Sequence, residues 1–177
     1  MDSDLEKLLQ ALRAAMEGMS EKQWGGHPEG KWSAAEVLEH LYLTYTGTIK
    51  GFERMLAEGK PLATAGSIKQ RVQTLVVLGF HYFPSGRKAP PQAMPRGLPR
   101  ELVRADVQEK IAAMDQIIRE GEKRFGKGPL LDHPILGPLS AKQWRRFHLV
   151  HGRHHAKQIE RLRQQMQQAA KSGSSKI

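Results

Sequence analysis

Apolar residues recur at every third or fourth position in four long segments of the chain, which is the spacing of amphipathic helices. The segments are residues 4–19, 33–58, 100–125 and 140–168. A shorter apolar stretch over residues 67–80 predicts one more helix. No segment alternates between apolar and polar residues for long enough to indicate a β-strand. The hydrophobic pattern therefore predicts an all-α fold.

Two of the predicted helices begin with a capping box, in which a serine and a residue three positions later bond to each other's backbone. Ser33 and Glu36 form the first box, and Ser140 and Gln143 form the second. The apolar positions that follow each box continue the helical spacing. The beginnings of these two helices are therefore better defined than those of the others.

Residues 81–99 hold five prolines and two glycines, so they cannot form a regular helix. Neither side of this stretch has enough helices to fold alone, which makes it a crossover inside one domain. Four helices with one long crossover between the second and the third predict a four-helix bundle, a fold that places metal sites between facing helices. We expect residues 1–168 to form this single domain, with a loop over 126–138, and residues 169–177 to be a disordered tail.

Four of the eight histidines fall between residues 148 and 155, inside the last predicted helix. His148, His151 and His155 lie three and four positions apart, on the face that also carries the apolar side chains. The basic residues expected on the opposite face are Lys142, Arg145, Arg146, Arg153, Lys157 and Arg163. Imidazoles on an apolar face are costly unless each finds a partner, and one metal ion would satisfy several at once.

Among these histidines, His151 and His155 form the strongest candidate ligand pair because they lie one turn apart and point the same way. A third ligand has to come from another helix, and His40 is favoured because it faces the core near the start of the second helix. His148 is the alternative, although three ligands on one straight helix rarely converge on one ion. His154 is expected to pack or to support the site. A histidine on an apolar face can also be an ordinary core residue, so spacing alone leaves both interpretations open.

Three imidazoles would leave one coordination position for water or substrate, which is the pattern of a catalytic site. Neutral imidazole suits zinc, nickel, iron and copper, so spacing does not choose the metal. The chain has no His-Glu-x-x-His motif, which excludes that class of metalloprotease. Glu36 is expected to be occupied by its cap and Glu39 to be exposed. No general base or other catalytic residue is therefore identified.

The chain of 177 residues has no cysteine, which excludes disulfides, a thiol nucleophile and a thiolate metal site. It shows no apolar signal region and no stretch long enough to span a bilayer, so a cytoplasmic protein without membrane association is expected. The net charge of +10 is concentrated in residues 61–100 and 129–177. Nucleic acid is one candidate partner, but no aromatic residues alternate with these basic residues, and a solvated basic face is favoured.

Two segments of the chain resemble the DinB superfamily, the DinB/YfiT-like metalloenzymes. They are residues 32–41 (WSAAEVLEHL) and residues 151–159 (HGRHHAKQI). Residues 133–144 (HPILGPLSAKQW) resemble more narrowly the DUF1569 branch of that superfamily. The resemblance extends over nearly the whole chain, and the motifs are specific in combination rather than singly.

The resemblance implies a four-helix bundle in up-down-down-up order, which needs a crossover such as residues 60–100. It also implies a divalent metal ion held by His40, His151 and His155, and we expect zinc or nickel. Characterised relatives include metal-dependent S-transferases that use low-molecular-weight thiols and a thiol-dependent isomerase. A small-molecule thiol is therefore the implied substrate, and a chain without cysteine is compatible with a thiol that comes from the ligand.

Three functional hypotheses stay open at this point. The first is a metal-dependent enzyme, either a thiol S-transferase or a hydrolase that uses metal-bound water. The second is a non-catalytic protein in which the ion holds two helices together, and a fourth protein ligand such as His148 would favour it. The third is a nucleic-acid-associated protein, which is the least expected of the three. The sequence is compatible with a homodimer and does not decide the oligomeric state.

Overall fold

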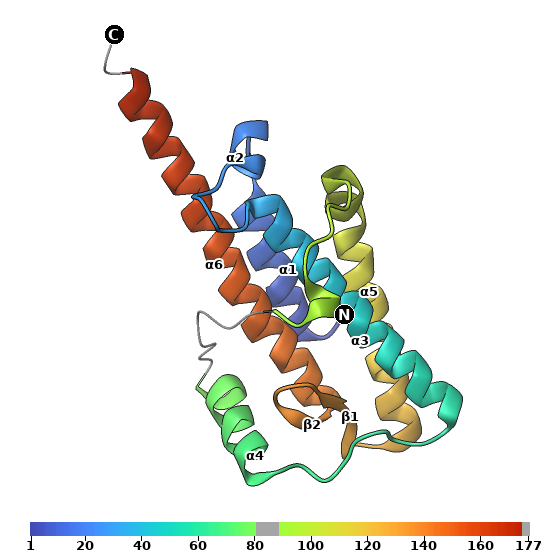
Figure 1. Cartoon of the computed structure of the whole chain (residues 1–177). Coiled ribbons are helices and arrows are strands. Elements are labelled where there is room, and N and C mark those ends of the chain that lie inside the picture. The colour runs from blue at the N-terminus through green and yellow to red at the C-terminus, as the bar shows by residue number, and fades with distance from the viewer. Residues whose placement is uncertain (81–88, 175–177) are drawn as a thin grey trace.

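The computed structural model describes residues 1–80 and 89–174 of the chain, with the side chains up to Ala169. The described residues are mostly helical, with a small two-stranded sheet (Figure 1). The α-helices are α1 (Ser3–Met16), α2 (Glu21–Gly25), α3 (Ala34–Glu58), α4 (Ile68–Thr74), α5 (Arg100–Phe125) and α6 (Ala141–Ser174). The strands are β1 (Pro129–His133) and β2 (Gly137–Ser140), and two short helical turns are η1 (Leu75–Gly79) and η2 (Pro91–Ala93).

The long helices α1, α3, α5 and α6 pack against one another around one apolar core. Helix α1 lies along α6, α3 lies along α5, and α3 also contacts α6. The last turns of α6 extend beyond the other helices (Figure 1). The buried core side chains include Leu8, Leu38, Phe52, Ile111 and Ile159. Burial of these side chains is the main source of stability, since each removes a large apolar surface from water.

The capping boxes predicted from the sequence are confirmed. Ser33 and Glu36 exchange hydrogen bonds at the start of α3, and Ser140 and Gln143 do so at the start of α6. Helix α3 ends at Glu58 and is capped by Gly59, whose φ of 69° is a left-handed conformation that glycine adopts without strain. The predicted helix over 100–125 is also confirmed, since α5 covers the same residues.

Residues 129–133 and 137–140 form two strands, so the expectation of a loop over residues 126–138 is wrong. The expectation of a purely all-α fold is wrong for the same segment. Strands β1 and β2 form an antiparallel hairpin that pairs Leu131 with Leu139 and His133 with Gly137. The strands have five and four residues, too few to show a clear alternation in the sequence. Pairing with each other and packing of Leu130 and Leu139 in the core stabilise this segment.

Other boundaries also differ from those expected. Helix α2 was not predicted because its five residues are too few for a helical pattern. Helix α6 continues to Ser174 rather than ending near residue 168. Of the expected disordered tail, residues 169–174 are therefore helical, and residues 175–177 lie outside the described residues.

The crossover between α3 and α5 is long and partly helical. The predicted shorter helix over residues 67–80 is present as α4 followed by the π-helical turn η1. Residues 81–88, which belong to the stretch predicted to be irregular, lie outside the described residues. The remainder of that stretch contains only the 3₁₀ turn η2, which packs against α3. None of the helices in the described residues is both long enough and apolar enough to cross a membrane.

Candidate metal centre

Three buried histidines from two helices converge in the core. His40 comes from the first part of α3, and His151 and His155 come from successive turns of α6. The Nε2 atom of His151 lies 3.2 Å from Nε2 of His40 and 3.1 Å from Nε2 of His155. One nitrogen from each ring lies within 4.8 Å of the other two. The three residues singled out from helical spacing are therefore brought together.

These separations suit coordination of one ion. Two nitrogens bound to a tetrahedral zinc ion at about 2.0 Å lie about 3.3 Å from each other. The two Nε2 separations of 3.1 and 3.2 Å from His151 are close to that value. Small movements of the side chains would therefore suffice to place three ligand nitrogens around a metal ion.

The tautomers of two rings also suit a ligand role. Nδ1 of His40 lies 2.8 Å from the carbonyl oxygen of Ala93, and Nδ1 of His155 lies 2.9 Å from Oε1 of Gln158. Both oxygens accept hydrogen bonds, so both Nδ1 atoms carry the proton. The Nε2 atoms of His40 and His155 then present lone pairs towards His151. Metal-bound histidines commonly make this kind of hydrogen bond through their other ring nitrogen.

The electrostatics of the cluster keep the rings neutral. Burial lowers the pKa of His155 to about 3, with a further lowering by the neighbouring His40. Burial also lowers the pKa of His40, and it lowers the pKa of His151 well below the usual value. The Nε2 lone pairs of neutral His40 and His155 therefore both point towards Nε2 of His151 at short range. A single N–H on His151 can satisfy only one of its two neighbours at a time, whereas a cation would satisfy all three rings.

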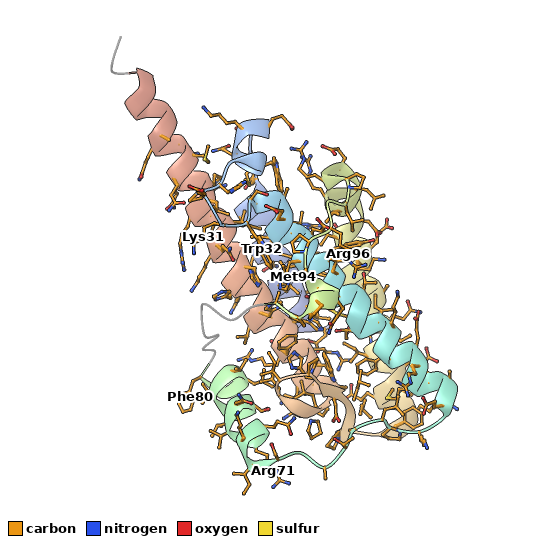
Figure 2. All side chains as sticks on the ribbon, in the orientation of Figure 1. Lys31, Trp32, Arg71, Phe80, Met94 and Arg96 are labelled. Atoms are coloured by element: carbon orange, nitrogen blue, oxygen red, sulfur yellow. The ribbon has the colours of Figure 1, made fainter. Side chains whose placement is uncertain are left out.

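A buried carboxylate holds the loop that orients His40. Glu39 is only 3% exposed, so the expectation that it faces solvent is wrong. Its oxygens accept hydrogen bonds from the backbone N–H groups of Arg96 at 2.7 Å and Gly97 at 3.2 Å. This loop crosses the N-terminal half of α3 (Figure 2) and carries the Ala93 carbonyl that binds His40. Glu39 therefore supports the tautomer of His40 through the loop.

Two other residues near the start of α3, Glu36 and Trp32, support the local structure around His40 rather than acting as a base. The carboxylate of Glu36 binds the backbone N–H of Ser33, as expected for a capping box, and is not free to act as a base. Trp32 packs against the ring of His40, with 5.2 Å between ring centroids. No general base for a reaction at the three histidines emerges from these two side chains.

His148, the alternative third ligand, does not join the cluster. Its Nε2 lies 3.1 Å from Oγ1 of Thr48, and that hydroxyl also lies 3.2 Å from the carbonyl oxygen of Thr44. The hydroxyl donates to the carbonyl and accepts from Nε2–H of His148. His148 is thus a core histidine with a polar partner. His154 is half-buried and packs against the ring of His155, as expected for a supporting residue.

An apolar cavity of about 530 Å³ lies beside the three histidines. It is lined by residues of α3, the hairpin, η2 and α6, including His40 and His151. Cavities of this size are typical of sites for small molecules. The histidine cluster is therefore accessible to a small ligand from the cavity side.

His133 is a cavity residue to which the sequence reasoning assigned no role. Its Nδ1 accepts hydrogen bonds from the backbone N–H groups of Ile135 and Leu136, both at 3.1 Å. Its ring packs on Phe147, with 4.3 Å between centroids, and burial lowers its pKa to about 4. The only signal in the sequence is a histidine that begins a tight Pro- and Gly-containing turn, where side chains often bind backbone N–H groups.

We expect the metal-free protein to lose stability as the pH falls below about 6.5. Burial lowers the pKa of His148 to about 3, so the unfolded chain takes up a proton in this range and the folded chain does not. This one residue should lower the free energy of unfolding by about 2 kcal/mol between pH 7.5 and pH 5. Urea denaturation at the two pH values measures the change, and His148→Gln should make it smaller. Equal stability at both pH values would contradict the buried neutral state of these histidines.

The basic side chains of α6 do not all face solvent. Lys142, Arg153 and Lys157 are exposed, as expected from the helical pattern. Arg145 is only 7% exposed and binds Asp115, so its predicted place on the outer face is wrong. The exposed basic residues lie away from the face of α6 that carries the histidine cluster.

The chain belongs to the family described as "Protein of unknown function (DUF1569)", whose profile matches residues 2–162. This match confirms the narrower of the two resemblances seen in the sequence, whereas membership of the wider DinB superfamily stays a prediction. None of the curated proteins and none of the solved structures matches the chain.

Proposed function

We propose that this DUF1569 protein binds one divalent metal ion, zinc or nickel, through Nε2 of His40, His151 and His155. We further propose that it is a metal-dependent transferase that acts with a small-molecule thiol. The observation that carries the proposal is the convergence of three buried Nε2 atoms at 3.1–3.2 Å from two helices. The helices α1, α3, α5 and α6 would then form a DinB-like four-helix bundle in up-down-down-up order, with the site between facing helices.

The metal part of the proposal rests on unsatisfied lone pairs. His40 and His155 use their Nδ1 protons elsewhere, so their Nε2 atoms can only accept. Protonating the cluster instead is opposed by burial, which lowers the pKa of each of the three rings. A cation is the partner that matches three neutral acceptors in a buried site.

The catalytic part rests on the side of the cluster that faces the cavity. Among the described residues, the group able to hold an ion consists of the three histidines alone. His148 binds Thr48 instead, so it does not supply a fourth ligand. Three protein ligands beside a cavity leave a position for a substrate, which favours an enzyme over an ion that only joins two helices.

The thiol part rests on the resemblance to the DinB superfamily and on the absence of cysteine from the chain. A bound divalent cation would lower the pKa of a coordinated thiol towards neutrality. The chain's own residues keep the imidazoles neutral and oriented, and the cavity beside them has largely apolar walls. A cavity of about 530 Å³ admits a small molecule and not a nucleic-acid duplex, which argues against the nucleic-acid hypothesis.

The test is a titration of cobalt-substituted protein with low-molecular-weight thiols such as cysteine and 2-mercaptoethanol. We expect thiolate-to-cobalt charge-transfer bands on addition of a thiol, and no such bands with the His151→Ala variant. Spectra that respond to no thiol, with or without an electrophile, would contradict the transferase proposal. The metal-dependent hydrolase and the non-catalytic metal-binding protein would then become the leading hypotheses.

A further inference from the structure

A glycine in the middle of a helix lies at the exposed side of the cavity beside the histidines. Gly47 lines it from α3, and a Cβ placed there would have no other atom within 4 Å. Glycine inside a helix costs about 1 kcal/mol relative to alanine. No close helix contact explains its use at this position. The absence of a side chain at residue 47 therefore leaves the mouth of the cavity unobstructed, and the packing of the protein does not require it.

The rest of the cavity wall is largely apolar. It is formed by Leu43 from α3, Leu131 and Ile135 from the hairpin, and Trp144 and Phe147 from α6. Such walls favour an apolar ligand body, because its transfer from water is favourable and the wall offers few polar partners. The wall also contains the carboxylate of Asp132, which already accepts hydrogen bonds from the backbone N–H and the hydroxyl of Thr64.

His133 differs from these apolar side chains because its ring has a hydrogen-bond donor without a partner among the described residues. Its Nδ1 accepts two backbone N–H groups, so the ring proton must lie on Nε2. No described residue makes a hydrogen bond to this Nε2, and the atom is not fully buried. Packing between Phe147 and Trp144 holds the ring in place. A residue of this mostly apolar wall therefore carries a fixed, neutral N–H donor.

We propose that His133 orients a ligand in this cavity by donating its Nε2–H to an acceptor oxygen of an apolar molecule, such as the oxygen of a carbonyl group. The inference rests on the proposed function only where it identifies this apolar molecule as the substrate that reacts with the thiol. The binding step itself depends on the cavity and on His133, and not on a metal ion. A histidine that only stabilised the turn of the hairpin would show no preference for an oxygen-bearing ligand.

The experiment compares two probes of nearly equal shape, acetophenone and ethylbenzene, which differ in one carbonyl oxygen. Their affinities are measured by NMR titration of the full-length protein, once after treatment with a chelator and once loaded with zinc. The His133→Asn variant removes Nε2–H but keeps an acceptor atom for the amides of Ile135 and Leu136, because Asn Oδ1 occupies the place of Nδ1.

We expect the ratio of the two affinities to shift against acetophenone by about threefold to tenfold in His133→Asn, the usual worth of one hydrogen bond. Gly47→Leu should lower the affinity for both probes, because a leucine side chain at the mouth would narrow the entrance to the cavity. An unchanged ratio in His133→Asn would overturn the role of His133, and unchanged binding in Gly47→Leu would overturn the site. A preference for acetophenone that appears only with zinc would also overturn the inference, because the ion would then bind the oxygen. That last result would leave the proposed function intact.

Discussion

Replacing His40, His151 or His155 by alanine should reduce the bound metal from about one ion per chain to nearly none. Each ring supplies one of three converging nitrogens, so its loss leaves two ligands and an open, hydrated site. Loss of a residue that merely supports a ligand typically lowers metal affinity by about 10- to 100-fold. Loss of a ligand itself should exceed that range. Elemental analysis of protein purified without a histidine tag, together with a competitive zinc titration, measures the effect.

The matched control is His27→Ala, which removes an exposed histidine that makes no contact with the cluster. This variant should bind as much metal as the parent protein. Normal metal content in His40→Ala would show that α3 does not contribute a ligand, and the three-histidine site would have to be abandoned. Normal metal content in His151→Ala would contradict the whole site, since Nε2 of His151 lies close to Nε2 of both His40 and His155 in the parent protein.

Much of this centre could be predicted from the sequence because it depends on helical periodicity. Two residues four positions apart must lie on one face of a helix, so His151 and His155 are neighbours in any fold that keeps α6 intact. The cap at Ser33 places His40 in the second turn of α3 and on its buried side. Only the packing of α3 against α6 had to be supplied by the fold.

The polar partners of the core could not be predicted, because they come from distant parts of the chain. Glu39 looks like a solvent-facing residue on α3 until the loop at Arg96 and Gly97 supplies its N–H donors, 57 and 58 residues away. The role of His133 depends on a hairpin whose strands are too short to show a pattern. Periodicity reports which face of a helix is buried on average, and it does not report which polar residues find a partner there.

Arg145 is the third such case, and it leads to the largest expected change in stability. Its Nε lies 3.1 Å from Oδ1 of Asp115, a residue of α5 that is only 2% exposed. Asp115 also accepts hydrogen bonds from the side chain of Arg119 and from the backbone N–H of Asp2, at 2.8 and 3.0 Å. One buried carboxylate therefore joins α5, α6 and the start of the chain. Burial alone would oppose these charges, so their stability depends on the whole set of contacts.

We expect Asp115→Ala to lower the free energy of unfolding by about 3–5 kcal/mol, the usual cost of leaving a buried charge without its partner. Arg145 would keep Glu122 at 2.8 Å, but that carboxylate is itself 30% exposed and cannot replace the buried contact or bind the N–H of Asp2. Urea denaturation measures the change. Glu109→Ala, which removes an exposed acidic residue of the same helix, should alter stability by less than about 0.5 kcal/mol. If the two variants were equally stable, the buried carboxylate of Asp115 would contribute no more to stability than a surface charge does.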